Sequence, residues 1–173
     1  MIDAFATLQL PRKATLTEDE VRAAYFALSK ADGADHAELN AAYELLLAPE
    51  KRLRHLLDLS AEQPKREWQA VTLPEDLMDS FMALGRLRPE AEALIEKRSK
   101  AQSALSKALL EPPTFALRDQ LEVIGTALDE KRKGLESALN ERMTWQEMSD
   151  VQARFSYVAK WQMQVRELLL RLM

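Results

Sequence analysis

Apolar residues recur every three or four positions along most of the chain, which is the spacing of one face of an α-helix. The first clear helix start is the capping box Thr17-Glu18-Asp19-Glu20, in which both end side chains can satisfy free backbone N–H groups. In the helix that follows, residues from Val21 to Leu28 are predicted to form the apolar side. The helix is predicted to stop at Asp32-Gly33.

Two more helices are predicted in the first 60 residues. One covers about His36 to Leu47, and the other follows Pro49, a residue that the first turn of a helix tolerates. A short apolar segment, Ala4-Phe5-Ala6-Thr7-Leu8, precedes them and ends before Pro11. We therefore expect residues 1–60 to form a small helical domain.

Residues 61–74 interrupt this pattern. They are mostly polar, contain two prolines and show no apolar period. Such a stretch is typical of a loop rather than of a packed element. We interpret residues 61–74 as a linker, and residues 75–173 as a second domain.

Three longer helices are predicted in the second domain. Capping boxes at Thr72-Leu73-Pro74-Glu75 and Thr144-Trp145-Gln146-Glu147 mark the starts of the first and the third. The proline pair Pro112-Pro113 is expected to separate the first from the second, which would run from about Thr114 to Asn140. Long helices with short connections predict an antiparallel three-helix bundle, so the whole chain is expected to be all-α.

The last helix carries two apolar stripes. Tyr157, Trp161 and Leu168 form a stripe distinct from the one that would seat the helix in a bundle. That main stripe consists of Met148, Val151, Phe155, Val158, Val165, Leu169 and Leu172. Two interpretations stay open: the helix is buried on both sides, or the second stripe is an exposed aromatic patch for a partner.

The first helix of the bundle has a similarly broad apolar side. Leu77, Phe81 and Leu84 share one stripe, and Met78 and Met82 widen it to about 160° of arc. A surface helix needs about 100° to face a core. The excess is either a broad core face or an adaptable binding surface, for which methionine is well suited.

Composition excludes several functional classes. The 173 residues contain no cysteine, two histidines and four glycines, with a net charge of −4. Disulfides and cysteine-ligated zinc are therefore ruled out, and a glycine-rich phosphate loop or a nucleic-acid surface is not expected. No apolar run approaches the ~18 residues of a membrane span, and the N-terminus lacks a signal-peptide layout. We expect a cytoplasmic protein that binds neither membrane nor nucleic acid.

Candidate catalytic groups are sparse. We interpret His36 as part of a charged helix start. We interpret His55 as a partly exposed side chain that packs on a short helix. Arg52 and Arg54 are candidates for a small basic spot. No nucleophile–base pair, carboxylate dyad or metal-ligand set stands out, so we expect no enzyme activity, no cofactor and no metal.

The order of these elements resembles the HscB family, the J-domain co-chaperones of iron–sulfur cluster assembly. In the first 60 residues the resemblance rests on Asn40-Ala41-Ala42-Tyr43 followed by Pro49-Glu50-Lys51-Arg52, and on two further segments. These are Phe5-Ala6-Thr7-Leu8-Gln9-Leu10-Pro11 and Tyr25-Phe26-Ala27-Leu28. In the second domain it rests on Asp76-Leu77-Met78-Asp79-Ser80-Phe81-Met82 and on Trp145, Tyr157 and Lys160.

The chain departs from this family in the loop that engages the chaperone. A working J-domain carries His-Pro-Asp there and a basic second helix, and with them stimulates the ATPase of a DnaK/HscA-type chaperone. At the matching positions stand Gly33, Ala34 and Asp35, and the second helix is not basic. We therefore predict a degenerate J-domain whose ATPase stimulation is lost or weak.

The resemblance also implies a binding surface for the iron–sulfur scaffold protein, which is IscU-like. Carried onto this sequence, its residues are Leu77, Met78, Phe81 and Tyr157. Met82 stands where the family has a glutamate, so an electrostatic part of that contact is expected to be missing. The predicted function is binding of such a scaffold or a related client. The alternative is a helical structural protein that uses the same stripes for self-association.

Overall fold

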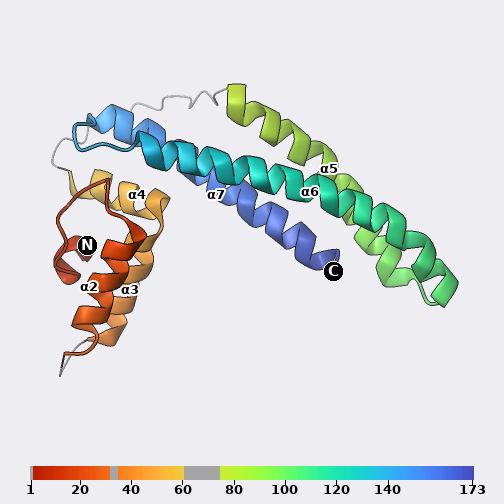
Figure 1. Cartoon of the computed structure of the whole chain (residues 1–173), viewed down its shortest axis with the longest axis horizontal. Coiled ribbons are helices and arrows are strands. Elements are labelled where there is room, and N and C mark those ends of the chain that lie inside the picture. The colour runs from red at the N-terminus through yellow and green to blue at the C-terminus, as the bar shows by residue number, and fades with distance from the viewer. Residues whose placement is uncertain (1, 32–34, 61–74) are drawn as a thin grey trace. The chain divides into compact units, whose positions relative to one another are not determined.

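The chain folds entirely into helices and connecting segments where the structure describes it. The structure is a computed structural model, which describes residues 2–31, 35–60 and 75–173. The helices in chain order are α1 (Ala4–Thr7), α2 (Glu18–Leu28), α3 (His36–Leu47), α4 (Pro49–Leu59), α5 (Glu75–Lys100), α6 (Ala104–Ala138) and α7 (Trp145–Arg171) (Figure 1). These ranges contain no strand, which confirms the all-α prediction.

The chain divides into two compact units. Unit 1 comprises Met1–Val71 and Leu135–Ser156, and unit 2 comprises Thr72–Gly134 and Tyr157–Met173. Unit 1 therefore includes the end of α6 and the start of α7 besides the N-terminal helices. The linker predicted at 61–74 and the capping box that begins at Thr72 lie outside the described residues.

Capping residues start the helices where the sequence predicts. In the box before α2, Thr17 Oγ1 accepts a hydrogen bond from the backbone N–H of Glu20 at 3.2 Å. In return Glu20 accepts one from the backbone N–H of Thr17 at 2.7 Å. Thr144 and Glu147 repeat the arrangement before α7, at 3.2 and 2.8 Å. The helix starts are thus determined locally, by side chains three residues apart.

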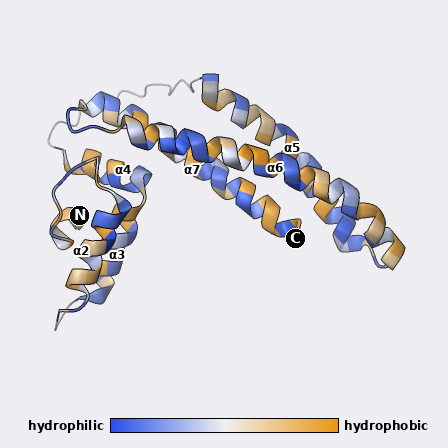
Figure 2. Ribbon diagram, viewed as in Figure 1, coloured by the Kyte–Doolittle hydropathy of each residue, from blue (hydrophilic) through white to orange (hydrophobic). Residues whose placement is uncertain are grey.

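The N-terminal helices of unit 1 enclose a continuous apolar core. It includes Phe5 and Leu8 from the first ten residues, both almost fully buried. The other buried members are Ala4, Leu16, Val21, Leu39, Ala42 and Leu46. Apolar and polar residues mix around each helix rather than forming blocks (Figure 2), so that each helix contributes one face to this core.

A second apolar cluster in unit 1 draws in the start of α7. Phe155 is fully buried against Leu53 of α4 and Ala14. Partly buried side chains close the cluster, namely Leu56, Leu135, Leu139, Met148 and Val151. The first part of the main apolar stripe of α7 therefore packs in unit 1.

The helices of unit 2 run alternately up and down. Phe81 of α5 meets Trp161 of α7, with ring centroids 5.6 Å apart. Later in both helices, Arg98 donates a hydrogen bond to the carbonyl of Leu172, so α5 and α7 are parallel. The α6–α7 contacts run in the opposite order, from Gly125 with Val165 to Asp129 with Gln162. These contacts confirm the antiparallel three-helix arrangement.

The predicted break at Pro112-Pro113 is wrong. Both prolines lie inside α6, and the chain turns earlier, at residues 101–103. There the hydroxyl of Ser103 accepts a hydrogen bond from the backbone N–H of Ser106 at 3.0 Å, as a helix cap does.

Exposure explains how α6 tolerates its prolines. Pro112 and Pro113 lie on its solvent side, as do Ala108 and Leu109. Because proline has no backbone N–H, the carbonyl groups of Ala108 and Leu109 lack their helical hydrogen bonds. Water can satisfy these carbonyls. On the next turn, the hydroxyl of Thr114 donates a hydrogen bond to the carbonyl of Leu110 at 2.6 Å.

The structure also bears on membrane association. Across residues 2–31, 35–60 and 75–173, no helix combines the length and the apolar character needed to cross a membrane.

Candidate docking surface

An exposed apolar surface lies on the first turns of α5. Met78, Phe81 and Met82 are 38%, 48% and 65% exposed. Their spacing of three and four residues places them on one side of the helix. We call these three residues, together with Tyr157 of α7, the α5–α7 surface.

Two ring contacts lie under this surface, one between α5 and α7 and one within α7. The ring centroid of Trp161 lies 5.6 Å from that of Phe81 and 5.8 Å from that of Tyr157. Trp161 is buried, at 4% exposed, whereas Tyr157 is partly exposed. The buried indole therefore supports two aromatic rings that reach the solvent.

The second stripe of α7 is divided between core and surface. Trp161 and Leu168 are both buried, which agrees with the interpretation that α7 is buried on both sides. The reason is the position of α7 between α5 and α6 in unit 2, where it has contacts with both neighbours. Only Tyr157 of this stripe keeps partial exposure.

Leu77 lies apart from the other residues predicted for scaffold binding. It is 2% exposed and packs inside unit 2. One residue along a helix is a rotation of about 100°, which separates the direction of Leu77 from that of Met78. Leu77 is therefore buried in the free chain, while Met78, Phe81 and Tyr157 reach the solvent.

Of the three residues predicted for a chaperone-binding loop, the one that the structure describes has a structural role. Asp35 is the N-cap of α3, and its Oδ1 accepts hydrogen bonds from the backbone N–H groups of Ala37 and Glu38, both at 3.1 Å. Helix capping is sufficient to explain an aspartate at this position. Gly33 and Ala34 lie outside the described residues.

The exposed side of α2 also lacks a basic character. The helix carries three acidic residues in its first turn, and Arg22 is its one basic residue. Arg22 is itself paired with Glu18 at 3.0 Å. Phe26, which is exposed, lies on the same helix.

Two expectations about α4 are wrong. His55 is buried rather than partly exposed, at 4%, and accepts a hydrogen bond from the backbone N–H of Ala4 at 3.1 Å. Arg52 is buried as well and donates to the carbonyl of Leu46 at 2.8 Å, so it offers no basic spot at the surface. Both errors have one cause: α4 packs on one side against α1 and α3 and on another against Phe155.

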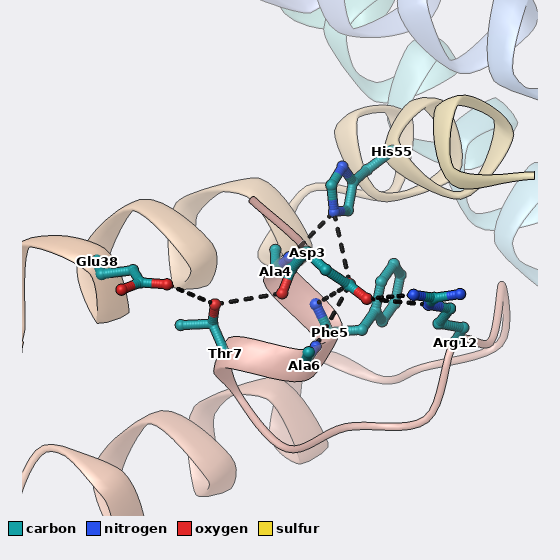
Figure 3. A network of polar contacts seen from close by, with 8 residues as sticks. All are labelled: Asp3, Ala4, Phe5, Ala6, Thr7, Arg12, Glu38 and His55. Carbon is teal, nitrogen blue, oxygen red and sulfur yellow. Dashed lines mark hydrogen bonds and ion pairs between the residues drawn. The ribbon is translucent and has the colours of Figure 1, made fainter. Parts of the chain in front are cut away.

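The sequence reading missed a polar network around the N-terminus (Figure 3). Asp3 caps α1 by accepting hydrogen bonds from the N–H groups of Phe5 and Ala6, and it also accepts one from Arg12 Nε at 3.0 Å. Burial raises the pKa of Asp3, but the hydrogen bonds from Arg12, Ala6 and Phe5 outweigh it and hold the pKa below its ordinary value. An aspartate directly before a short apolar segment is the one signal in the sequence for this cap.

No metal-binding arrangement is visible among the described residues. In that part of the chain, no three histidine, aspartate or glutamate side chains gather closely enough to hold an ion. Of the four side chains of the α5–α7 surface, only that of Tyr157 carries a hydroxyl group, and none is charged. The chemistry available at this surface is apolar contact.

Comparisons with known proteins bear on the fold. No protein-family model matches the sequence, and no curated protein matches it. Among solved structures, the chain is similar to the chaperone HscB from Vibrio cholerae, with 19% sequence identity and a TM-score of 0.53. The similarity covers 99% of this chain and 100% of that chain. The chain therefore has an HscB-like, all-α fold over the residues that the structure describes.

Proposed function

We propose that this protein is a co-chaperone that binds an IscU-like iron–sulfur scaffold, or a related client, through the α5–α7 surface. The observation that supports it most is the exposure of Met78, Phe81, Met82 and Tyr157 on an HscB-like fold. Three of these four are residues that the family resemblance selects for scaffold binding.

The chemistry of the surface favours a protein as the ligand. Aromatic side chains are enriched among the residues that carry most of the energy of protein interfaces. Flexible methionines such as Met78 and Met82 adapt to the shape of a partner. Because Trp161 holds the rings of Phe81 and Tyr157 from beneath, these rings lose little freedom on binding.

Stimulation of a DnaK/HscA-type chaperone is proposed to be lost or weak. Asp35 is engaged in capping α3, and the histidine and proline of a working loop are absent from the sequence. An acidic first turn on α2 supports the same conclusion, because a basic helix is what the chaperone contact requires in the family. The N-terminal helices then serve as a structural module, and the protein acts by binding rather than by catalysis.

A matched pair of methionine variants tests the binding site. Met82→Ala removes an exposed side chain of the α5–α7 surface, and Met163→Ala removes one from α7 that is exposed to nearly the same degree, 65% against 63%. Titration calorimetry with the scaffold from the same organism should show saturable binding. We expect Met82→Ala to weaken it several-fold and Met163→Ala to leave it unchanged.

Two results of this titration contradict the proposal. Absence of binding by the folded wild-type chain removes the scaffold as a partner. Equal effects of Met82→Ala and Met163→Ala place the binding site elsewhere on the molecule.

Self-association through the same surface is the second candidate. The exposure of Phe81 and Met82 favours it, since a contiguous apolar surface of this kind is uncommon on a monomer without a use. Sedimentation at several protein concentrations distinguishes the two functions. A stable dimer that Met82→Ala dissociates supports self-association, whereas a monomer at all concentrations leaves client binding.

A further inference from the structure

His55 is held inside unit 1 by one directed contact and one stacked ring. Its Nε2 accepts a hydrogen bond from the backbone N–H of Ala4 at 3.1 Å (Figure 3). The ring stacks on Phe5, with centroids 5.7 Å apart and planes 13° from parallel. The other histidine of the sequence, His36, is exposed.

The Ala4 contact is possible only for an uncharged imidazole. An acceptor nitrogen has no proton, so the single ring proton of His55 lies on Nδ1. A second proton would sit on Nε2 and would face the N–H of Ala4. Protonation therefore removes an acceptor and leaves two donors opposed at a buried position.

The nearest carboxylate is already engaged. Asp3 Oδ1 lies 3.9 Å from His55 Nε2. The same oxygen accepts hydrogen bonds from Phe5 and Ala6 at the start of α1, and Oδ2 accepts from Arg12. The carboxylate of Asp3 is therefore already used by the cap of α1 and by Arg12.

Charged groups of both signs line the groove beside the ring. His55 lines a groove of about 710 Å³ in unit 1, between α3, α4 and the start of α7. The ionisable residues of this groove are Glu38, Glu44, Glu50, Lys51, Arg54 and Asp58. Glu38 accepts from the hydroxyl of Thr7 and Asp58 from Arg54. The α7 residues in the groove, Gln152 and Ser156, carry no charge.

We infer that His55 is a pH-sensitive switch that holds residues 3–10 against α4 within unit 1. When His55 is neutral, Ala4 is tied to α4, and Phe5 and Leu8 stay in the core. When His55 gains a proton, the Ala4 bond is lost and α1 loosens next to the groove. The stabilisation is thus present while the ring of His55 is uncharged and is lost when acid charges the ring.

Hydrogen exchange of the Ala4 amide in the full-length chain tests the switch. Nuclear magnetic resonance gives its protection factor, which is corrected for the intrinsic effect of pH on exchange. The same samples report the titration of the His55 ring. Between about pH 8 and pH 5 we expect the protection of Ala4 to fall about tenfold, in step with that titration.

Three variants assign the effect. His55→Gln keeps an oxygen acceptor for Ala4 but does not titrate, so its Ala4 protection should not vary with pH. His36→Gln should behave as the wild type does. Asp3→Asn removes the nearest carboxylate charge, and the fall in protection should persist in it.

Several outcomes would overturn the inference. One is a His55 ring that titrates while Ala4 protection stays constant, and another is a ring that takes no proton down to about pH 5. These two are read in the wild type alone, so they hold even if His55→Gln fails to fold. A third is a pH-dependent fall that survives in folded His55→Gln.

Discussion

The half-exposed ring of Phe81 covers the buried ring of Trp161, with centroids 5.6 Å apart and planes 36° from parallel. Phe81 thereby belongs to two environments, since one face of its ring closes the core of unit 2 and the rest is open to a partner. The buried ring of Trp161 thus holds the α5–α7 surface in shape, whereas the exposed part of Phe81 is available to a client.

Phe81→Ala is expected to reduce both client binding and stability. We expect a loss of about 1–2 kcal/mol in binding free energy, as for other aromatic interface residues. The free energy of unfolding should fall by less than the ~3–5 kcal/mol of a fully buried phenylalanine, because half of this ring is already in water. Calorimetry and urea denaturation measure the two effects. A variant of unchanged affinity would remove Phe81 from the site.

Tyr157→Ala is expected to weaken scaffold binding by about 1–2 kcal/mol or more while the helical content stays intact. The ring is partly exposed and packs at a tilt against Trp161, so we expect its removal to leave the indole in place. Calorimetry and circular dichroism on the same sample test both statements. If the variant unfolds, the ring belongs to the core and is not available to a partner.

Restoring the chaperone-binding loop should not restore chaperone activation. In the double variant Gly33→His with Ala34→Pro, residues 33–35 read His-Pro-Asp. We expect no stimulation of a DnaK/HscA-type ATPase, because α2 still has an acidic first turn and a single basic residue, which is paired. Strong stimulation in a steady-state ATPase assay would show that the loop alone was limiting.

The capping boxes should contribute to an acid-sensitive part of the stability. Hydrogen bonds from the backbone N–H of Thr17, and then from its hydroxyl, hold the pKa of Glu20 below its ordinary value of 4.5. A lowered carboxylate pKa adds stability that is present above 4.5 and is lost as the pH falls below it. Glu20→Gln should therefore flatten the fall of the denaturation midpoint in that range.

A glutamate without a capping role provides the control for this measurement. Glu44 is exposed on α3, and Glu44→Gln should leave the acid dependence close to that of the wild type. Glu147 is held in the same way by Thr144, and its pKa is lowered for the same reason, so Glu147→Gln should behave like Glu20→Gln. Identical curves for Glu20→Gln and the wild type would contradict the assignment.

Most helix boundaries could be predicted because their signals are local. The boxes at Thr17 and Thr144, and the bounds of α3 at His36 and Leu47, agree with the structure. The break at Pro112-Pro113 could not be located in this way. A proline interrupts a helix or is tolerated depending on whether the freed carbonyls reach solvent, and that is a property of the folded molecule.

The candidate surface was only partly accessible to sequence reasoning. Spacing identified an excess of apolar positions at Met78, Phe81 and Met82, and these are exposed. It could not distinguish Trp161 from Tyr157, which share one stripe, yet the first is buried and the second partly exposed. The difference arises from the ring of Phe81, which lies 80 residues earlier in the chain and covers Trp161.

The sequence by itself determined the helical class and the starts of α2, α3 and α7, because capping and apolar periodicity act within a few residues. Tertiary structure alone decided which apolar side chains stay exposed, that α6 continues through two prolines, and that His55 becomes a buried acceptor for Ala4. Each of these depends on a contact or a solvent exposure between residues far apart in the chain. No local pattern encodes such a contact, because it exists only once the helices have packed.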